Sequence, residues 1–309
     1  MSKTHVYDMI IVGGGPGGYT AAIYAASAGL DTLVLEKLSA GGQMALSEEI
    51  NNYPGFEEGV DGYTLAEKMQ RQAERFGART VYAEVERMEL AAEPKVLETS
   101  EGVFYARTVA LATGAGPREL GLADEAELVG RGVAYCAACD GMRYRGKTVV
   151  VVGGGNSAAG DALALSRIAE KVILVHRRDK LRATKAYDRP LSQAGNIEFR
   201  WNSAVVELLH GDKLSGVRLR DVNTGEETEL ACDGVFISVG RKPATELVKG
   251  QLELDKNGYI AADETTKTSL PGVYAVGDVR TKALRQVVTA VADGAAAVHM
   301  AEEYLAGGE

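Results

Sequence analysis

The sequence contains two copies of one glycine-rich segment, and this internal repeat is its strongest constraint on the fold. The first copy reads GGGPGG after the apolar run DMIIV, and the second reads GGGNSA after TVVVV. Corresponding positions lie 140 residues apart, so that Gly13 and Gly15 match Gly153 and Gly155. An apolar strand, a glycine-rich turn and a small-residue helix in this order are typical of a dinucleotide-binding unit. The repeat therefore predicts two such units in an α/β fold.

The first copy carries the residue types that a dinucleotide needs. Glycines let the backbone approach a pyrophosphate closely, and the N-terminus of the following helix faces its negative charge. The next predicted strand, TLVLE, ends in Glu36, and a carboxylate at this place accepts hydrogen bonds from both ribose hydroxyls. We therefore predict that Gly13, Gly15, Gly18 and Glu36 bind an adenine dinucleotide without a 2′-phosphate.

The second copy differs at the place of the acid. The repeat aligns Glu36 with His176, which opens the basic segment HRRDKLR. Cations suit a 2′-phosphate where a carboxylate suits a free hydroxyl, so this copy is predicted to bind NADPH. Arg177, Arg178 and Arg182 are the candidate phosphate ligands. A solvated basic turn is the alternative, but a position at the end of the second strand favours phosphate binding.

Two of the three cysteines form a C-x-x-C pair shortly before the second copy, in YCAACDGM. A zinc site needs about four ligands, whereas Cys232 and the four histidines are scattered through the sequence, so we predict no metal site. A structural disulfide between Cys136 and Cys139 would close a very small loop and add little stability. Redox exchange between dithiol and disulfide fits best. Asp140 follows the pair directly, either as a proton-transfer group or as a turn cap.

Two similar apolar segments, TVALATGAGPRE and GVFISVGRKPAT, lie before and after the second copy. We interpret them as the crossings into and out of an inserted domain. The prediction is an inserted NADPH-binding domain over 116–240 that carries the cysteine pair, and a discontinuous domain over 1–115 and 241–309 that contains the first dinucleotide unit. In the returning part, GVYAVGDV is predicted to be a strand that ends at Gly277 and Asp278, followed by a long helix from near Arg285.

Composition excludes several classes of partner. The net charge is -9 and the sequence pI is about 5.2, whereas binding to nucleic acid needs a basic surface. No stretch approaches the roughly 18 apolar residues of a membrane span. The apolar run near the N-terminus is too short for a signal peptide, and the low cysteine content agrees with a reducing compartment. We therefore expect a cytoplasmic protein that contacts neither nucleic acid nor membrane.

Taken together, the motifs of the chain resemble a known family over essentially the whole length. The sequence is similar to the low-molecular-weight, bacterial-type thioredoxin reductases of the class II pyridine nucleotide-disulphide oxidoreductases. The motifs that carry the resemblance are GGGPGGYTAAIYAASAG, GGQ, NNYPG, ATGA, CAACDG, GGGNSA, HRRDKLRA, GVYAVGDV and RQVVTA. The resemblance implies two Rossmann-like three-layer domains, one inserted into the other, with FAD in the first and NADPH in the second. It also implies a homodimer and, as partner, thioredoxin or a thioredoxin-like disulfide protein.

The resemblance also assigns roles to individual residues. Cys139 is expected to lie against the flavin, Cys136 to attack the protein substrate and Asp140 to act as the acid–base group. Ala138 stands where many members carry threonine. The expected FAD contacts are Gly13, Gly15, Pro16, Gly17, Gly18, Glu36, Gly42, Gln43, Asn52, Thr113, Gly114, Gly277, Asp278, Arg285 and Gln286. The expected NADPH contacts are Gly153, Gly155, Asn156, Ser157, His176, Arg177, Arg178 and Arg182.

The activity implied is transfer of a hydride from NADPH to FAD and of electrons onward to the cysteine pair. Because nicotinamide and disulfide cannot occupy the flavin face together, we expect the NADPH domain to rotate about the crossings near Gly114 and Gly240. The alternatives are the flavoprotein subunit of a peroxide-reducing system, and a reductase that takes electrons from ferredoxin or a deazaflavin. A redox-sensing flavin-binding module is the non-enzymatic alternative.

Overall fold

The structure is a computed structural model that describes residues 5–47 and 49–307. Residues 1–4, which belong to the segment considered for an export signal, lie outside the described residues. The chain divides into two compact units. Met1–Gly116 and Lys242–Glu309 form one, which we call the flanking unit, and Pro117–Arg241 form the other, which we call the inserted unit.

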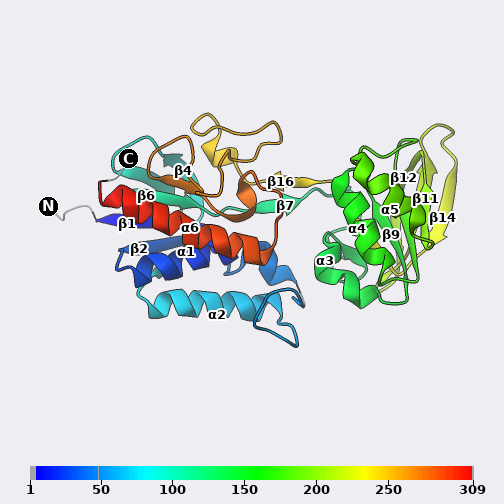
Figure 1. The fold of residues 1–309 in the computed structure, drawn as a ribbon, viewed down its shortest axis with the longest axis horizontal. Helices are drawn as coiled ribbons and strands as arrows, with labels where there is room; N and C mark the ends of the chain where they lie inside the picture. Colours follow the sequence, from blue (N-terminus) through cyan, green and yellow to red (C-terminus); the bar gives the residue numbers. More distant parts are fainter. Residues whose placement is uncertain (1–4, 48, 308–309) are drawn as a thin grey trace. The chain divides into compact units, whose positions relative to one another are not determined.

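The flanking unit is built on a seven-stranded sheet with the order β3-β2-β1-β6-β5-β4 (Figure 1). β1, β2, β3 and β6 are parallel, β17 joins the end of β6 in parallel, and β4 and β5 are antiparallel. The runs MIIV and LVL form core strands because both faces of this sheet are covered. The strands are Val6–Val12 (β1), Thr32–Glu36 (β2), Arg79–Tyr82 (β3), Val85–Glu89 (β4), Lys95–Thr99 (β5), Gly102–Leu111 (β6) and Val273–Ala275 (β17).

Two hydrophobic cores lie on opposite faces of this sheet. Helices α1, α2 and α6 cover one face, and on the other face side chains of β1, β2, β4, β5 and β6 pack with parts of segment 247–279. The contact of α1 with α6 depends on Gly294, since a Cβ there would collide with the carbonyl oxygen of Gly17. The helices are Pro16–Ser27 (α1), Gly62–Arg75 (α2) and Val287–Leu305 (α6), with 3-10 turns at Gly42–Leu46 (η1), Glu246–Val248 (η4) and Gly277–Val279 (η5).

The inserted unit has three layers around a parallel sheet with the order β11-β10-β9-β15-β8. Helices α3, α4 and α5 pack on one face through small and aliphatic side chains, and an antiparallel sheet of β12, β13 and β14 covers the other. The strands are Val133–Ala134 (β8), Thr148–Val152 (β9), Lys171–Val175 (β10), Ile197–Arg200 (β11), Ser203–His210 (β12), Leu214–Asp221 (β13), Glu227–Ala231 (β14) and Gly234–Ile237 (β15). The helices are Ala137–Asp140 (α3), Asn156–Ser166 (α4) and Asp188–Gln193 (α5), with 3-10 turns at Gly141–Tyr144 (η2) and Lys185–Tyr187 (η3).

The structure contains the two predicted copies of the strand–helix–strand unit. β1, α1 and β2 of the flanking unit correspond to β9, α4 and β10 of the inserted unit, and each set forms a parallel strand–helix–strand unit. β2 ends at Glu36, as predicted, and β10 ends directly before His176. The predicted crossings contain two short strands, β7 (Ala115–Pro117) and β16 (Arg241–Pro243). The two-copy α/β fold class is thus confirmed.

The two element ends predicted for the returning part have different outcomes. β17 ends at Ala275, before Gly277, because Gly277 has a φ of +76° and opens the 3-10 turn η5. The last helix begins at Val287, two residues after Arg285, which confirms the predicted start near Arg285. Gln286 is its N-cap, and Thr289 Oγ1 accepts the Gln286 N–H at 3.1 Å in a capping box.

Candidate functional site

The first glycine loop is tightly packed on one side and open on the other. Gly13 has a φ of +105°, and a Cβ there would lie 2.5 Å from the carbonyl oxygen of Ala112. A Cβ on Gly18 would collide with the carbonyl oxygen of Gly13. By contrast, a Cβ on Gly15 would have no neighbour within 4 Å among the described residues. Pro16 then starts α1, so the loop offers an open backbone at a helix N-terminus, where a pyrophosphate can bind.

The carboxylate of Glu36 lies directly behind this loop. Its Oε2 accepts the N–H of Gly14, and its Oε1 accepts the N–H of Lys37 at 2.9 Å. These bonds fix the carboxylate at the end of β2, and a carboxylate can accept about four hydrogen bonds. The Glu36 carboxylate can therefore still accept hydrogen bonds from ribose hydroxyls.

The GGQ segment lies against the same loop. The Gly41 N–H donates to the carbonyl oxygen of Gly14 at 2.7 Å. A Cβ on Gly42 would lie 3.9 Å from the Cα of Gly15, and Gln43 follows in η1. The structure thus brings Gly42 to the predicted pyrophosphate loop although the two glycine segments are separated by α1 and β2.

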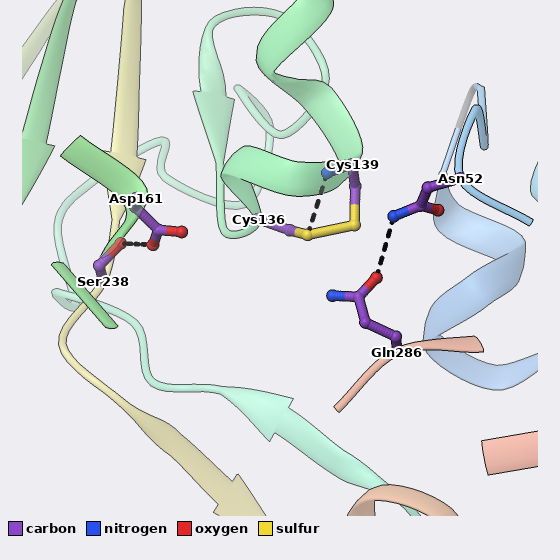
Figure 2. The surroundings of a disulfide bond; sticks show 6 residues. All are labelled: Asn52, Cys136, Cys139, Asp161, Ser238 and Gln286. Carbon is purple, nitrogen blue, oxygen red and sulfur yellow. Dashed lines mark hydrogen bonds between the residues drawn. A yellow bond between two sulfur atoms is a disulfide. The ribbon is translucent and has the colours of Figure 1, made fainter. Parts of the chain in front are cut away.

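Two more predicted FAD contacts meet in the flanking unit. The Asn52 side chain donates to Oε1 of Gln286 at 3.1 Å, across 234 positions of sequence (Figure 2). Elsewhere in this unit, the Thr113 hydroxyl donates to the carbonyl oxygen of Ala244 at 2.7 Å. Gly114 accepts the Ala244 N–H at 3.0 Å.

A buried acid that sequence reasoning missed supports the segment around Gly277. Asp293 of α6 accepts the Gly277 N–H at 2.8 Å, Arg280 Nη2 at 2.7 Å and Lys282 Nζ at 2.7 Å. Burial favours a raised pKa for Asp293, but the bonds from Arg280 and Lys282 outweigh it and lower the pKa below its usual value. The only signal in the sequence is an acid within the apolar helix VVTAVADGAAAV.

Arg285 is held close to the same segment. Its guanidinium lies 3.9 Å from the ring centre of Tyr259 and donates to the carbonyl oxygens of Asp278 and Arg280. N–H groups of the Arg285 guanidinium thus donate to backbone carbonyl oxygens. The predicted flavin contacts of Arg285 and Asp278 stay predictions.

The second glycine loop repeats the first, with His176 in the place of Glu36. Gly153 has a φ of +154°, and a Cβ there would collide with the carbonyl oxygen of Ser238. The imidazole of His176 lies over Gly154, where any Cβ would collide with the ring. Gly155 again has no neighbour within 4 Å of an added Cβ among the described residues. The loop is therefore tightly packed at Gly153 and Gly154 and open at Gly155, which matches the first copy.

The surroundings of His176 favour the neutral form of its ring. Burial and then the positive charges of Arg182, Arg178 and Arg177 lower the pKa of His176. The side chains of all three arginines are exposed. The arginines thus lie near the end of β10, around the position where the first copy has its acid.

Hydrogen bonds of Asn156 and Arg182 connect the basic segment after β10 to the second glycine loop and the start of α4. The Arg182 N–H donates to the carbonyl oxygen of Gly154 at 2.6 Å, and Asn156 Oδ1 accepts the N–H of Thr184 at 2.8 Å. Ser157 is exposed in the first turn of α4. The structure therefore brings the predicted NADPH contacts of the inserted unit together at one edge of its sheet.

The cysteine pair forms a disulfide at the start of α3. The Cα atoms of Cys136 and Cys139 are 5.3 Å apart, and Cys136 is the N-cap residue of the helix. The sulfur of Cys136 accepts the N–H of Cys139 at 3.2 Å (Figure 2). Asp140 ends the helix, and its acid–base role stays a prediction. Cys232 is buried, and burial raises the pKa of its thiol to about 12, which makes it unreactive.

Within residues 5–47 and 49–307, His, Cys, Asp and Glu side chains form no group of three or more that could hold a metal ion. In the same ranges, no helix combines the length and the apolar character needed to span a bilayer.

The sequence matches the family model described as pyridine nucleotide-disulphide oxidoreductase over residues 7–294. The chain belongs to this family. Its relatives include a thioredoxin reductase of Treponema pallidum, 45% identical over 97% of each chain. Another, from Streptomyces clavuligerus, is 46% identical over 97% of this chain and 94% of the relative. The crystal structure of thioredoxin reductase from Streptococcus pyogenes superposes with a TM-score of 0.89 at 42% identity, covering 98% of this chain and 99% of the other.

These similarities confirm the predicted resemblance and the predicted enzyme class. As a pyridine nucleotide-disulphide oxidoreductase of the thioredoxin reductase type, the protein is a flavoprotein oxidoreductase that uses FAD and NADPH. The residues present fit both cofactors. Each copy has an open glycine backbone at a helix N-terminus, one beside a carboxylate and the other beside three arginines.

Proposed function

We propose that the chain is a thioredoxin-disulfide reductase that binds FAD in the flanking unit and NADPH in the inserted unit. The observation that carries this proposal is the Cys136–Cys139 disulfide, placed on the helix that precedes the second dinucleotide loop. The relatives named thioredoxin reductase support thioredoxin as the substrate. A homodimer and a cytoplasmic location, both expected from the sequence, belong to the proposal.

The chain's own residues perform the disulfide chemistry. FAD, when bound, supplies the electron transfer that links NADPH to the disulfide. Once the pair is reduced, the Cys136 thiolate attacks the substrate disulfide and releases one substrate thiolate. The Cys139 thiolate then attacks the mixed disulfide, releases the second substrate thiol and restores the Cys136–Cys139 bond. Asp140 is assigned the proton transfers to and from these thiols.

Rotation of the inserted unit is part of the proposed cycle. Gly114 has a φ of +73° and Gly240 a φ of +115°, and both lie in the crossings between the units. Glycine tolerates changes of such backbone angles more readily than other residues. The proposed domain limits remain 1–115 with 241–309, and 116–240.

A second candidate is an NADPH-dependent reductase of another disulfide protein, including the C-x-x-C carrier of a peroxide-reducing system. The same cysteine pair and the same basic segment would serve it. The relatives' names favour thioredoxin over these carriers.

The test is turnover of NADPH with a panel of oxidised acceptors. The panel contains thioredoxin, a glutaredoxin-like protein, a peroxide-system carrier and a small aromatic disulfide. We expect thioredoxin to give the highest kcat/KM, and Cys232→Ala to keep this activity, since Cys232 is a buried thiol outside the pair. If NADPH bleaches the flavin but no disulfide sustains turnover, the reductase function is refuted and a sensor is favoured.

A further inference from the structure

The basic segment after β10 is held in place by a turn that none of the sequence motifs includes. This turn, residues 200–203, joins β11 to β12. β11 is the edge strand beside β10, and its last residue, Arg200, pairs with Val175 at the end of β10. The turn therefore lies at the edge of the sheet where the basic segment begins with His176.

Three backbone hydrogen bonds join this turn to the basic segment. The His176 N–H donates to the carbonyl oxygen of Arg200 at 2.9 Å, and the Ser203 N–H donates to the carbonyl oxygen of His176 at 3.0 Å. The Asn202 N–H donates to the carbonyl oxygen of Arg178 at 3.2 Å. The turn thus fixes the backbone from His176 to Arg178, and with it the place from which the arginine side chains extend.

Asn202, which donates the third of these bonds, has a left-handed backbone. Its φ is +50°, a conformation that asparagine tolerates better than most residues other than glycine. Its own carbonyl oxygen accepts the N–H of Val222 at 2.7 Å, which connects the turn to the segment after β13. A residue that avoids the left-handed region would therefore disturb a turn that is bonded to its neighbours on both sides.

Trp201, the only tryptophan of the chain, contacts both β11 and the His176 ring. It stacks on Phe199 of β11, with ring centres 4.8 Å apart and an angle of 9° between the planes. It meets the His176 ring edge-on, with 6.5 Å between the ring centres. His176 in turn lies over Gly154 of the glycine loop, and its Nε2 is buried without a hydrogen-bond partner among the described residues. Packing against Trp201 and Gly154 therefore helps to orient this ring.

We propose that residues 200–203 are a positioning element for the 2′-phosphate of NADPH. Asn202 sets the backbone of the basic segment, and Trp201 sets the orientation of the His176 ring. The proposal rests on the proposed function, because it requires that the inserted unit binds NADPH. Recognition of a phosphate by arginine depends on the geometry of the guanidinium fork. A shift of the backbone behind the arginines therefore weakens the contacts to the phosphate more than those to the rest of the nucleotide.

The test is calorimetric binding of NADP⁺ and NAD⁺ to the oxidised, FAD-loaded full chain. Neither oxidised nucleotide reduces the flavin, so binding is separated from electron transfer. Asn202→Ala and Asn202→Gly both remove the amide side chain and keep the backbone N–H, but only glycine adopts the left-handed conformation readily.

The expected effect follows from this conformational preference. Alanine in place of glycine disfavours the native turn by a factor of about 5 to 30, and the apparent affinity falls with the population of the binding-competent state. We expect NADP⁺ to bind about 5 to 10 times more weakly to Asn202→Ala than to Asn202→Gly or wild type, with less than about a twofold change for NAD⁺.

Asp124→Ala is the matched control. Asp124 is another residue of the inserted unit with a left-handed backbone, with a φ of +59°. Its carboxylate lies 3.3 Å from Nε2 of His210, the last residue of β12. Ser203, at the other end of that strand, is roughly 20 Å away. Asp124→Ala brings the same kind of strain to the same unit, and its ratio of NADP⁺ to NAD⁺ affinity should equal that of wild type.

Trp201→Leu is the second variant, used if Asn202→Ala yields no folded holoprotein. It removes the edge contact with the His176 ring. Aromatic pairs contribute enough beyond their buried area that NADP⁺ should bind about 2 to 10 times more weakly, with NAD⁺ again little changed.

An unchanged NADP⁺ affinity, an equal weakening of NADP⁺ and NAD⁺, or an equal effect of Asp124→Ala overturns the role of the turn. These results leave the reductase function standing, because wild type still prefers NADP⁺. If wild type binds NADP⁺ no better than NAD⁺, the phosphate site of the inserted unit and the role of the turn are refuted together. Turnover with oxidised thioredoxin tests the reductase activity separately.

Discussion

The two glycine-rich copies share one backbone and differ in the side chain that lies behind the loop. In the flanking unit the Glu36 carboxylate accepts the N–H of Gly14. In the inserted unit the His176 ring lies over Gly154, at the matching position. The two copies therefore match in structure as well as in sequence. In each copy, the residue at the end of the second strand or directly after it contacts the second glycine of the loop.

This change of side chain explains how one type of unit can be adapted to two nucleotides. A carboxylate offers hydrogen-bond acceptors to ribose hydroxyls without a further partner. The pKa of His176 is lowered, so we expect the positive charge for a phosphate to come from the three exposed arginines around it. We therefore propose that cofactor choice depends on the end of β2 or β10 and the few residues after it, while the same type of glycine loop binds the pyrophosphate in both copies.

The largest expected effect concerns the cysteine pair, which precedes only the second copy. Cys136→Ser and Cys139→Ser should each abolish disulfide reduction, because exchange needs both thiols. NADPH should still bleach the flavin in both variants. Gel analysis of mixed disulfides with oxidised thioredoxin checks the roles: only Cys139→Ser, which keeps Cys136, should trap the partner. Trapping by Cys136→Ser would reverse the assignment of the two thiols.

The next largest effect is expected at Asp140, which follows the cysteine pair and has no counterpart before the first copy. Asp140→Asn should slow transfer through the disulfide by about 10² to 10⁴, as is typical for a lost acid–base group. FAD content and flavin reduction by NADPH should stay the same. Stopped-flow spectroscopy of the flavin separates reduction from reoxidation. If reoxidation by the acceptor keeps its rate and pH profile, Asp140 only ends the turn.

A smaller effect is expected at the acid of the first copy. Glu36→Gln keeps the shape of the side chain but replaces one acceptor oxygen by a donor. The lost charged hydrogen bond is worth about 1.5 kcal/mol or more, so FAD should bind at least roughly tenfold more weakly. Reconstitution of the apoprotein with FAD measures this. Glu302→Gln, at an exposed position of α6, is the matched control, and equal weakening in both variants would contradict the assignment.

The smallest effect is expected from protonation of His176. Its folded-state pKa is lowered, so the unfolded chain binds the proton at higher pH than the fold does. Stability should therefore fall as the pH drops below about 6.5, the usual value for histidine. Urea unfolding at neutral and mildly acid pH should show a smaller acid-side loss in His176→Asn than in wild type. An equal loss would show that the ring is not held neutral by its surroundings.

The features readable from the sequence are those with a fixed local spacing. The glycine loops, Glu36 and His176 follow strands of clear apolar character, and the structure has these strands at the predicted positions. Family resemblance supplied residues such as Asn52 and Gln286, but not the hydrogen bond that joins them across 234 positions.

The acids that bind distant partners were not predictable from local pattern. Asp293 reaches Gly277 across 16 positions, and Asp161 reaches Ser238 across 77. Each looks like an ordinary polar residue in a helix until the fold brings its partner near. The end of β17 was misplaced for a related reason, because the backbone angle of Gly277 depends on the packing around it.

We propose that the two copies bind different dinucleotides because their side chains differ at the end of the second strand and directly after it. The most direct test of this proposal is the dissociation constant for NADPH and for NADH in wild type and in a variant with Arg177, Arg178 and Arg182 all changed to Gln. Each charged contact to the phosphate contributes about 1.5 to 3 kcal/mol. NADPH binding should weaken by about 1,000-fold or more, with little change for NADH, and Arg189→Gln at an exposed position of α5 should alter neither. An unchanged ratio of the two constants would contradict the account.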